Sequence, residues 1–379
     1  MRFAVYTNSL SEHQVPLARE IVSCIGAENF RYIYDGSSSQ AFQQSIAAEE
    51  WILPYNSGAE TTEKFAQAEK WLVLAEVVLV GGLRPIELME RRAAKGLTTL
   101  YMSERWFKPI SRRISVLGLR LIVRLPGWVR MWVPSYRKMT KRFVRLVNEN
   151  ACVKFLPIGP HATWDFCRIG VRDEKMVAWG DFVSPGRHIA ARGPLEVAER
   201  TVMRVLWVGR MLYWKRVEDI VRAVDRANEA LASKGSGGNI HLTLVGAGAE
   251  EDRIGKRIAK SRHSAFITCR PPVTMDAVRG LMRENDVYVF ASDETEGWGC
   301  VVSEALEEGM RVIGTYEAGA SAAILPKERL FHAGDVGALA SLLIKELRGE
   351  LPDCQIGDWT AKAAATRLLK EVGWRCAMD

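Results

Sequence analysis

The sequence contains no C-x-x-C pair and no apolar run long enough to cross a membrane. Its seven cysteines stand singly and are odd in number, whereas disulfide frameworks and zinc sites need paired or clustered cysteines. A membrane-spanning helix needs about 20 apolar residues in succession, and the N-terminal stretch MRFAVYTNSL has no basic and apolar leader. We therefore expect a protein of the reducing cytoplasm that is neither secreted nor membrane-spanning.

Two signatures of nucleotide and nucleic-acid binding are missing as well. The dinucleotide fingerprint G-x-G-x-x-G does not occur, and no motif for base readout or for an RNA platform is present. With 48% hydrophobic and 26% charged residues, the composition is that of an ordinary folded protein rather than a disordered or fibrous one. We expect a sizeable hydrophobic core and no nucleic-acid partner.

The length and the alternation of segments predict two α/β domains. A chain of 379 residues exceeds the roughly 250–300 residues at which single cores stop growing. In each half, short β-branched or aromatic runs alternate with stretches of helical spacing, which predicts β-α-β units and a parallel sheet. The predicted strands are 2–7, 30–35, 76–82, 97–103, 152–159, 204–210, 240–248, 265–270, 287–292 and 310–316, and the predicted helices are 13–25, 85–96, 216–232, 251–260, 275–285 and 300–309.

These segments divide the chain into four parts. We predict an N-terminal Rossmann-like domain over residues 1–185, a Pro- and Gly-containing linker over 186–200, and a C-terminal Rossmann-like domain over 201–357. Residues 358–379 contain a terminal helix, which we expect to cross back to the N-terminal domain. The two domains are expected to face an interdomain cleft.

The positive charge of the chain is concentrated in residues 105–145. This segment holds twelve Lys or Arg residues and no Asp or Glu, so that the rest of the chain is net acidic although the whole carries +7. The cations alternate with aromatic residues, namely Trp106, Phe107, Trp128, Trp132, Tyr136 and Phe143. Such a mixture suits an anionic membrane surface. The alternatives are a solvated basic face whose aromatics pack into the N-terminal domain, or nucleic-acid binding.

Two cations and a small loop follow strands of the second half. Gly209 and Arg210 end the predicted strand RVLWVGR, and Lys215 lies five residues beyond Arg210, before a helix. Ligands of parallel sheets bind outside the carboxyl ends of the strands, where a guanidinium and an ammonium together can neutralise a diphosphate. Gly209 belongs to the same turn, and Gly246 opens a small G-A-G loop that lets main chain approach a nucleotide. Each feature alone also fits an ordinary loop.

The strongest motif is ASDETEGWGCVVSEALEEG, in which a buried strand leads to an acidic glycine loop and then to a helix. Glu296 stands in the loop and Glu304 one turn into the helix, eight residues apart. A carboxylate can accept two hydrogen bonds from a vicinal diol, such as that of a ribose or a hexose. We expect the loop residues Gly297, Trp298 and Gly299 to line the same site. After the next strand, main-chain N–H groups at Gly319 would form a second phosphate cradle.

The first half carries weaker signals. Ser9 and His13 lie in the loop after the first strand, and Glu104 follows the strand LTTLYMS. Each of them is placed where a parallel sheet binds its ligand, so that an acceptor hydroxyl could be contacted there. An ordinary loop or capping role is the alternative for all three.

The order G-R-x4-K, L-V-G-x-G and E-G-W-G-C-V-V-S-E-A-L-E resembles the C-terminal domain of the retaining glycosyltransferases of the glycosyl transferases group 1 family, which have the GT-B fold and an E-x7-E motif. The resemblance covers about residues 204–324. It implies that Arg210 and Lys215 contact the diphosphate of a nucleoside-diphosphate sugar, that Glu296 lies near the transferred sugar, and that Glu304 holds the ribose. It also implies that no metal or other cofactor is needed.

This sequence departs from the family pattern in two loops. The usual G-G-x-x-E phosphate loop is reduced to Gly319-Ala320-Ser321-Ala322-Ala323, and the usual glycine-rich first loop is replaced by Ser9-Leu10-Ser11-Glu12. We expect transfer of a sugar, most readily from a UDP or GDP donor, to a glycan or lipid-linked acceptor of cell-surface polysaccharide or glycolipid synthesis. The enzyme would work at the inner face of the membrane. A sugar-nucleotide epimerase of the same fold and a non-catalytic sugar-nucleotide-binding scaffold are the alternatives.

Overall fold

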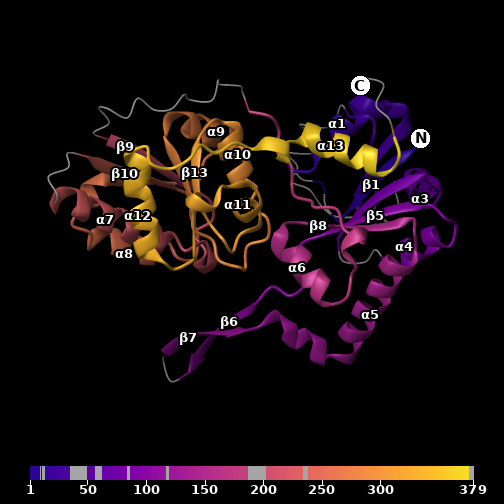
Figure 1. Ribbon diagram of the computed structural model, residues 1–379, viewed down its shortest axis with the longest axis horizontal. Coiled ribbons are helices and arrows are strands. Elements are labelled where there is room, and N and C mark those ends of the chain that lie inside the picture. The colour runs from indigo at the N-terminus through magenta and orange to yellow at the C-terminus, as the bar shows by residue number, and fades with distance from the viewer. Residues whose placement is uncertain are drawn as a thin grey trace. The chain divides into compact units, whose positions relative to one another are not determined.

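The computed structural model describes residues 1–8, 10, 13–34, 49–55, 62–82, 86–116, 119–186, 202–233 and 238–374, without the side chains of 54, 62–64 and 110–124. The chain forms two compact units (Figure 1). Unit 1 comprises Met1–Ser184 and Asp358–Asp379, and unit 2 comprises Pro185–Gly357.

Unit 1 is built on a parallel sheet of six strands in the order β3-β2-β1-β4-β5-β8. The strands are β1 (Phe3–Thr7), β2 (Phe30–Tyr34), β3 (Ile52–Pro54), β4 (Val77–Gly81), β5 (Thr98–Ser103) and β8 (Val153–Pro157). Near-continuous apolar runs such as VVLVG in β4 are buried on both faces, as parallel strands require. The strand order reverses between β1 and β4, which is where open parallel sheets bind ligands.

Helices cover both faces of this sheet. They are α1 (Val15–Ile25), α3 (Thr62–Leu74), α4 (Ile86–Ala93), α5 (Pro134–Glu149), α6 (Pro160–Arg168) and α13 (Ala361–Glu371). One core joins strand residues to apolar residues of α3, α4, α5 and α6, with Phe143 and Phe155 fully buried at its centre. The terminal helix α13 packs against α1, and its Glu371 forms an ion pair with Lys154 of β8. The last helix therefore belongs to the N-terminal unit, as the fold prediction has it.

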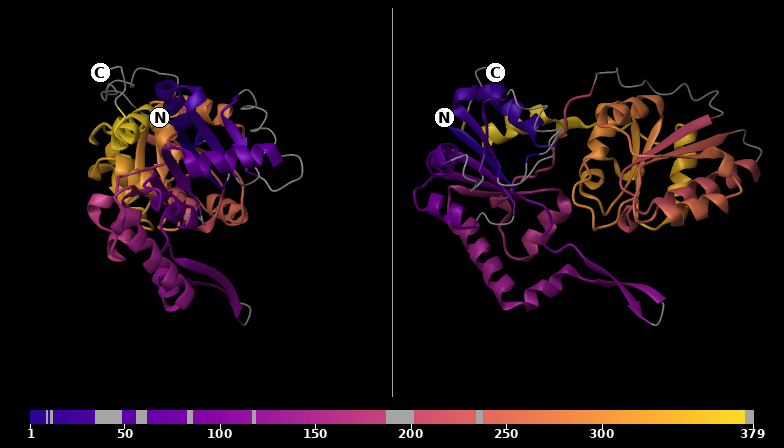
Figure 2. Two further views of the ribbon diagram at one scale, coloured as in Figure 1. Left: turned by 90° about the vertical axis from the view of Figure 1, so that its right-hand side faces the viewer. Right: turned by 180° about the vertical axis from the view of Figure 1, so that it is seen from behind.

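A β-hairpin of unit 1 stands outside the sheet. Its strands β6 (Ile110–Val116) and β7 (Leu119–Leu125) pair antiparallel, with Ile110 opposite Leu125. Figures 1 and 2 show it as a two-stranded ribbon that extends away from the other strands and helices of its unit. No strands were predicted in this segment, because its mixture of apolar and basic residues was interpreted as a membrane-binding or solvated surface and not as a pair of strands.

Unit 2 repeats the architecture. Its sheet has the order β11-β10-β9-β12-β13-β14. The strands are β9 (Val202–Val208), β10 (Asn239–Val245), β11 (Ile267–Arg270), β12 (Val287–Phe290), β13 (Arg311–Thr315) and β14 (Leu330–Phe331), all paired in parallel. The order reverses between β9 and β12. Every strand and helix predicted from the sequence has a counterpart in the two units.

The helices of unit 2 complete a second hydrophobic core. They are α7 (Val217–Ser233), α8 (Glu251–Ala259), α9 (Met275–Glu284), α10 (Val301–Glu307), α11 (Gly319–Ile324) and α12 (Val336–Leu347). Alternate residues of β9, namely Met203, Val205 and Trp207, pack with apolar residues of α7, α8 and α12. No helix of the described chain is long and apolar enough to span a bilayer.

Candidate functional site

The predicted donor residues lie at the carboxyl ends of β9 and β12, where the strand order of unit 2 reverses. Gly209 and Arg210 follow β9, and the loop with Glu296 follows β12. Ligands of doubly wound sheets bind at such a reversal, because the loops on either side of it turn in opposite directions.

The two central strands separate at this end, and Tyr288 spans the gap. β12 pairs with β9 only at Val287 and Tyr288. Beyond them, the Tyr288 hydroxyl donates to the Val208 carbonyl (3.0 Å) and accepts from the Val208 N–H (3.4 Å). The phenol thus satisfies main-chain groups that a neighbouring strand would otherwise pair. Burial raises the pKa of Tyr288 far above its ordinary value, and the negative charges of Glu304 and Glu296 raise it further, so the hydroxyl stays protonated.

Lys215 and Glu296 form an ion pair in this structure. Each side chain is only 16% exposed, and the Lys215 ammonium lies 5.5 Å from the centre of the buried Phe290 ring. The two loops are joined through their main chains, because the Asp293 N–H donates to the Trp214 carbonyl at 2.9 Å. Charge-assisted contacts of this kind are strong when partly shielded from water, so the pair fixes the positions of both side chains.

Glu304 lies in the first turn of α10, and its residue is 5% exposed. The chain turns into this helix at Gly299, which has φ 91°. A side chain at that position would begin 2.5 Å from the Phe290 ring, so only glycine lets the loop close over Phe290. The glycine loop therefore brings Glu296 and Glu304 to the same end of the sheet.

The other glycines of the predicted site serve chain packing in this structure. A Cβ at Gly246 would lie 1.9 Å from the Gly209 carbonyl oxygen, so the loop after β10 lies directly against the loop after β9. The N–H groups of Gly319 and Ala320 donate to the carbonyls of Gly297 and Trp298 at 3.0 and 2.8 Å. These two amides are engaged within the protein, and the phosphate cradle expected at Gly319 stays a prediction.

Arg210 differs from Lys215 in its surroundings. Its side chain is exposed, and no carboxylate among the described residues forms an ion pair with it. Of the three predicted catalytic residues, the structure therefore brings Lys215 and Glu296 into contact. Arg210, five residues before Lys215, is exposed to solvent. Sequence reasoning missed Tyr288, because nothing marks a buried strand tyrosine as a member of a site.

A second candidate site is a cavity of about 720 Å³ in unit 1. It opens at the carboxyl ends of β1, β4 and β5, beside the reversal of strand order. Its lining includes Thr7, Gly81, Ser103, Glu104, Trp106, Lys108, Arg130, Tyr136 and Asp181. Volume, position and the mixture of aromatic and charged side chains are those of a small-molecule site.

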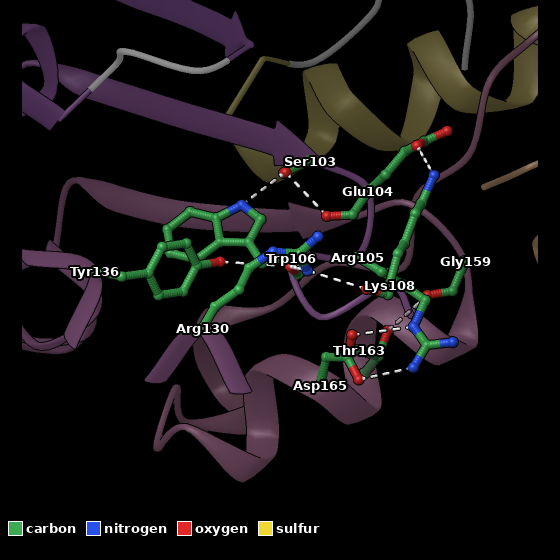
Figure 3. Close-up of polar contacts among 10 residues, drawn as sticks. All are labelled: Ser103, Glu104, Arg105, Trp106, Lys108, Arg130, Tyr136, Gly159, Thr163 and Asp165. Carbon is green, nitrogen blue, oxygen red and sulfur yellow. Dashed lines mark hydrogen bonds and ion pairs between the residues drawn. The ribbon is translucent and has the colours of Figure 1, made fainter. Parts of the chain in front are cut away.

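The residues after β5 are held by a polar network (Figure 3). The Trp106 indole N–H donates to the Ser103 hydroxyl at 3.1 Å, and Lys108 forms an ion pair with Glu104. Arg105 contacts the fully buried Asp165 through two bonds of 3.0 and 3.1 Å. These contacts hold the side chains of Arg105, Trp106 and Lys108 in position at the rim of the cavity.

The three predicted acceptor-side residues have different outcomes. Glu104 lines the cavity. His13 lies just before α1 and is not part of the lining, whereas its neighbour Gln14 is. Ser9 lies outside the described residues. The cations Lys108 and Arg130 were counted only as part of the basic segment, and their place in a cavity depends on the fold.

The aromatic residues of the basic segment divide into two groups. Phe107 and Phe143 are 1% and 0% exposed, so for these two the packing alternative is correct and the membrane interpretation is wrong. Trp106, Trp128 and Tyr136 are half-buried, whereas Trp132 is 84% exposed and stands just before α5, next to the 49% exposed Val133. Among the aromatic residues named for this segment, Trp132 is therefore the one that is largely exposed.

Residues 198–357 match the model of the family described as glycosyl transferases group 1. The matched residues lie within unit 2. No curated protein matches the sequence.

Solved structures show the same two-domain fold over the whole chain. The lipopolysaccharide outer core galactosyltransferase WaaB is similar with a TM-score of 0.67 at 13% identity, covering 98% of this chain and 100% of its own. A glycosyltransferase from Rickettsia africae gives 0.61 at 13%, with 98% and 97% covered. Anabaena Alr3699/HepE in complex with UDP gives 0.58 at 13%, with 98% and 95% covered. The fold is GT-B, with two Rossmann-like units.

Proposed function

We propose that the protein transfers a sugar from a nucleoside-diphosphate sugar to a glycan or lipid-linked acceptor, with retention of anomeric configuration. The observation that carries the proposal is the Lys215–Glu296 ion pair beside Glu304 at the strand reversal of unit 2. The Anabaena relative of the same fold has been solved with UDP, which supports a UDP donor here.

In the proposed reaction, each side chain has one task. Lys215 and Arg210 neutralise the diphosphate as the bond between the anomeric carbon and the phosphate oxygen breaks. Glu304 accepts hydrogen bonds from the ribose hydroxyls, and Glu296 contacts the sugar being transferred. The acceptor oxygen bonds to the anomeric carbon, and its proton passes to the departing phosphate oxygen. The two cations take the part that a metal plays in other transferases.

A thermal-shift screen against UDP-, GDP-, ADP- and dTDP-sugars, followed by a product assay, tests the proposal. We expect one nucleotide class to raise the melting temperature and its sugar to appear on an added glycan or lipid-linked acceptor. Isomerisation or hydrolysis of the donor without any acceptor would instead support the epimerase alternative. Failure of every sugar nucleotide to bind would support the scaffold alternative.

We further propose that α5 docks the enzyme on an anionic membrane surface at the cytoplasmic face. Arg137, Lys138 and Lys141 are exposed on this helix, and no carboxylate among the described side chains pairs with them. They line a groove of about 1060 Å³ together with the exposed Trp132. Cations beside an interfacial tryptophan suit the headgroup region of an anionic bilayer, and a lipid-linked acceptor would be found there.

A further inference from the structure

Among the described residues that line the cavity of unit 1, the cation Arg130 takes part in no ion pair. Among its lining residues, Arg105 is paired with Asp165 and Lys108 with Glu104. Arg130 forms no ion pair with any described carboxylate. Its guanidinium is held only by neutral groups, because Nη1 donates to the main-chain carbonyls of Trp106 and Lys108 at 2.9 and 3.0 Å.

The position of Arg130 is built into the fold. After the hairpin, the chain returns at Gly127, where a Cβ would lie 2.1 Å from the Phe107 carbonyl oxygen. The next residue, Trp128, stacks on the buried Phe107 at 3.9 Å between ring centres. The short 3₁₀ helix Gly127–Trp132 then places Arg130 over the main chain of residues 106–108, beside Tyr136 (Figure 3).

Comparison with Arg92 shows that Arg130 has bonding capacity left. Arg92 is fully buried and also has no carboxylate bonded to it, but its Nε, Nη1 and Nη2 atoms all donate to protein oxygens, at 2.8 to 2.9 Å. Arg130 donates to described protein groups through Nη1 alone, and it lines a cavity rather than the core. A planar guanidinium with free N–H groups in a partly enclosed site favours a phosphate or carboxylate.

We propose that this cavity binds a phosphate-bearing sugar, with its phosphate on Arg130. The sugar ring then lies against Trp106 and Tyr136, and its hydroxyls donate to Glu104, which stands at the end of β5. That this ligand is the acceptor of the reaction rests on the proposed transfer function. The binding itself needs only unit 1.

The test compares two ligands that differ in the phosphate group. α-D-glucose 1-phosphate and methyl α-D-glucoside are titrated into the full-length protein by calorimetry, both in the wild type and in the Lys215→Ala variant. We expect the phosphate to improve affinity about tenfold or more, equally in both backgrounds because Lys215 belongs to the other unit. Loss of the preference in Lys215→Ala would place the phosphate in the donor site and overturn the proposal.

Variants of Arg130 give the second part of the test. Arg130→Gln should abolish the preference for the phosphate, and Arg130→Lys should keep part of it because the charge remains. Arg91→Gln, at an exposed arginine of α4 that lines neither cavity, should change nothing. Circular dichroism confirms that each variant is folded. Equal affinity for the two ligands in the wild type, or a preference kept in a folded Arg130→Gln variant, would contradict the proposal.

A third ligand distinguishes the two sources of such a phosphate. Prenyl-phosphate-linked glucose in detergent should bind more tightly than free glucose 1-phosphate if the natural ligand is lipid-linked, and no more tightly if it is a soluble sugar phosphate. Either outcome supports the phosphate site, provided that Arg130→Gln weakens the binding of these ligands. The transfer function is tested separately by sugar-nucleotide binding, so its failure would leave the phosphate preference in place.

Discussion

The Lys215 ammonium is paired with the Glu296 carboxylate, although the two residues lie 81 positions apart. In the proposed reaction both are needed for the donor, one at the diphosphate and the other at the sugar. The ion pair therefore holds Lys215 near the site before the nucleotide arrives, and a diphosphate must compete with Glu296 for the ammonium.

This competition predicts an asymmetric effect of Glu296→Gln. Removing the negative charge frees the Lys215 ammonium, so affinity for the nucleoside diphosphate should stay within about threefold of the wild type or increase. Turnover should fall about 100-fold or more, because an electrostatic contact to the reacting sugar is lost. Calorimetry and a transfer assay measure the two quantities. Weaker nucleotide binding with unchanged turnover would mean that Glu296 holds the nucleotide instead.

Glu304→Ala should weaken nucleotide binding only because the hydrogen bonds between the carboxylate and the ribose hydroxyls are lost. The wild type should bind UDP, or whichever nucleoside diphosphate the screen identifies, about tenfold more tightly than its 2′,3′-dideoxy analogue, since hydrogen bonds to a carboxylate contribute roughly 1.5–3 kcal/mol. In Glu304→Ala the two ligands should bind alike. If the variant still prefers the ribonucleotide, Glu304 does not contact the ribose.

Tyr288→Phe should destabilise unit 2 and loosen the donor site. The substitution removes both bonds to Val208 and leaves its main-chain groups unpaired, at a cost of about 1–3 kcal/mol. The melting temperature and the affinity for the nucleotide should both decrease. Tyr316→Phe is the control, because its hydroxyl donates to the Lys327 carbonyl at an exposed position, over 3.3 Å. If the two variants had the same melting temperature and the same nucleotide affinity, Tyr288 would have no part in holding the donor site.

The membrane proposal predicts salt-sensitive co-sedimentation with anionic vesicles. Each cation near such a surface contributes about 1 kcal/mol, so replacing Arg137, Lys138 and Lys141 by Ser should lower partitioning about 100-fold. Replacing Lys256, Lys260 and Arg262, which are exposed on unit 2, should have little effect. Neutral vesicles or high salt should release the wild type. A wild type that stays in the supernatant with anionic vesicles at low salt would contradict the proposal.

Much of the fold could be predicted because parallel strands are buried on both faces and appear as apolar runs, as in Val77–Gly81 and Val287–Phe290. The donor residues follow such runs directly. Arg130 could not be found this way, because its role depends on how the chain returns at Gly127 after the hairpin. The sequence left the placement of Phe107 and Phe143 open for a related reason: aromatic residues in a basic segment have the same sequence pattern whether they pack inward or outward.

The most direct test of the central claim is titration of UDP and GDP into the wild type and into Lys215→Ala. The site at the ends of β9 and β12 predicts that at least one of the two nucleotides binds the wild type. The variant should lose about 1.5–3 kcal/mol of binding free energy, which raises the dissociation constant roughly 10- to 150-fold. Arg262→Ala, an exposed arginine elsewhere on unit 2, should bind like the wild type. Equal affinity of Lys215→Ala and the wild type for both nucleotides would contradict the account.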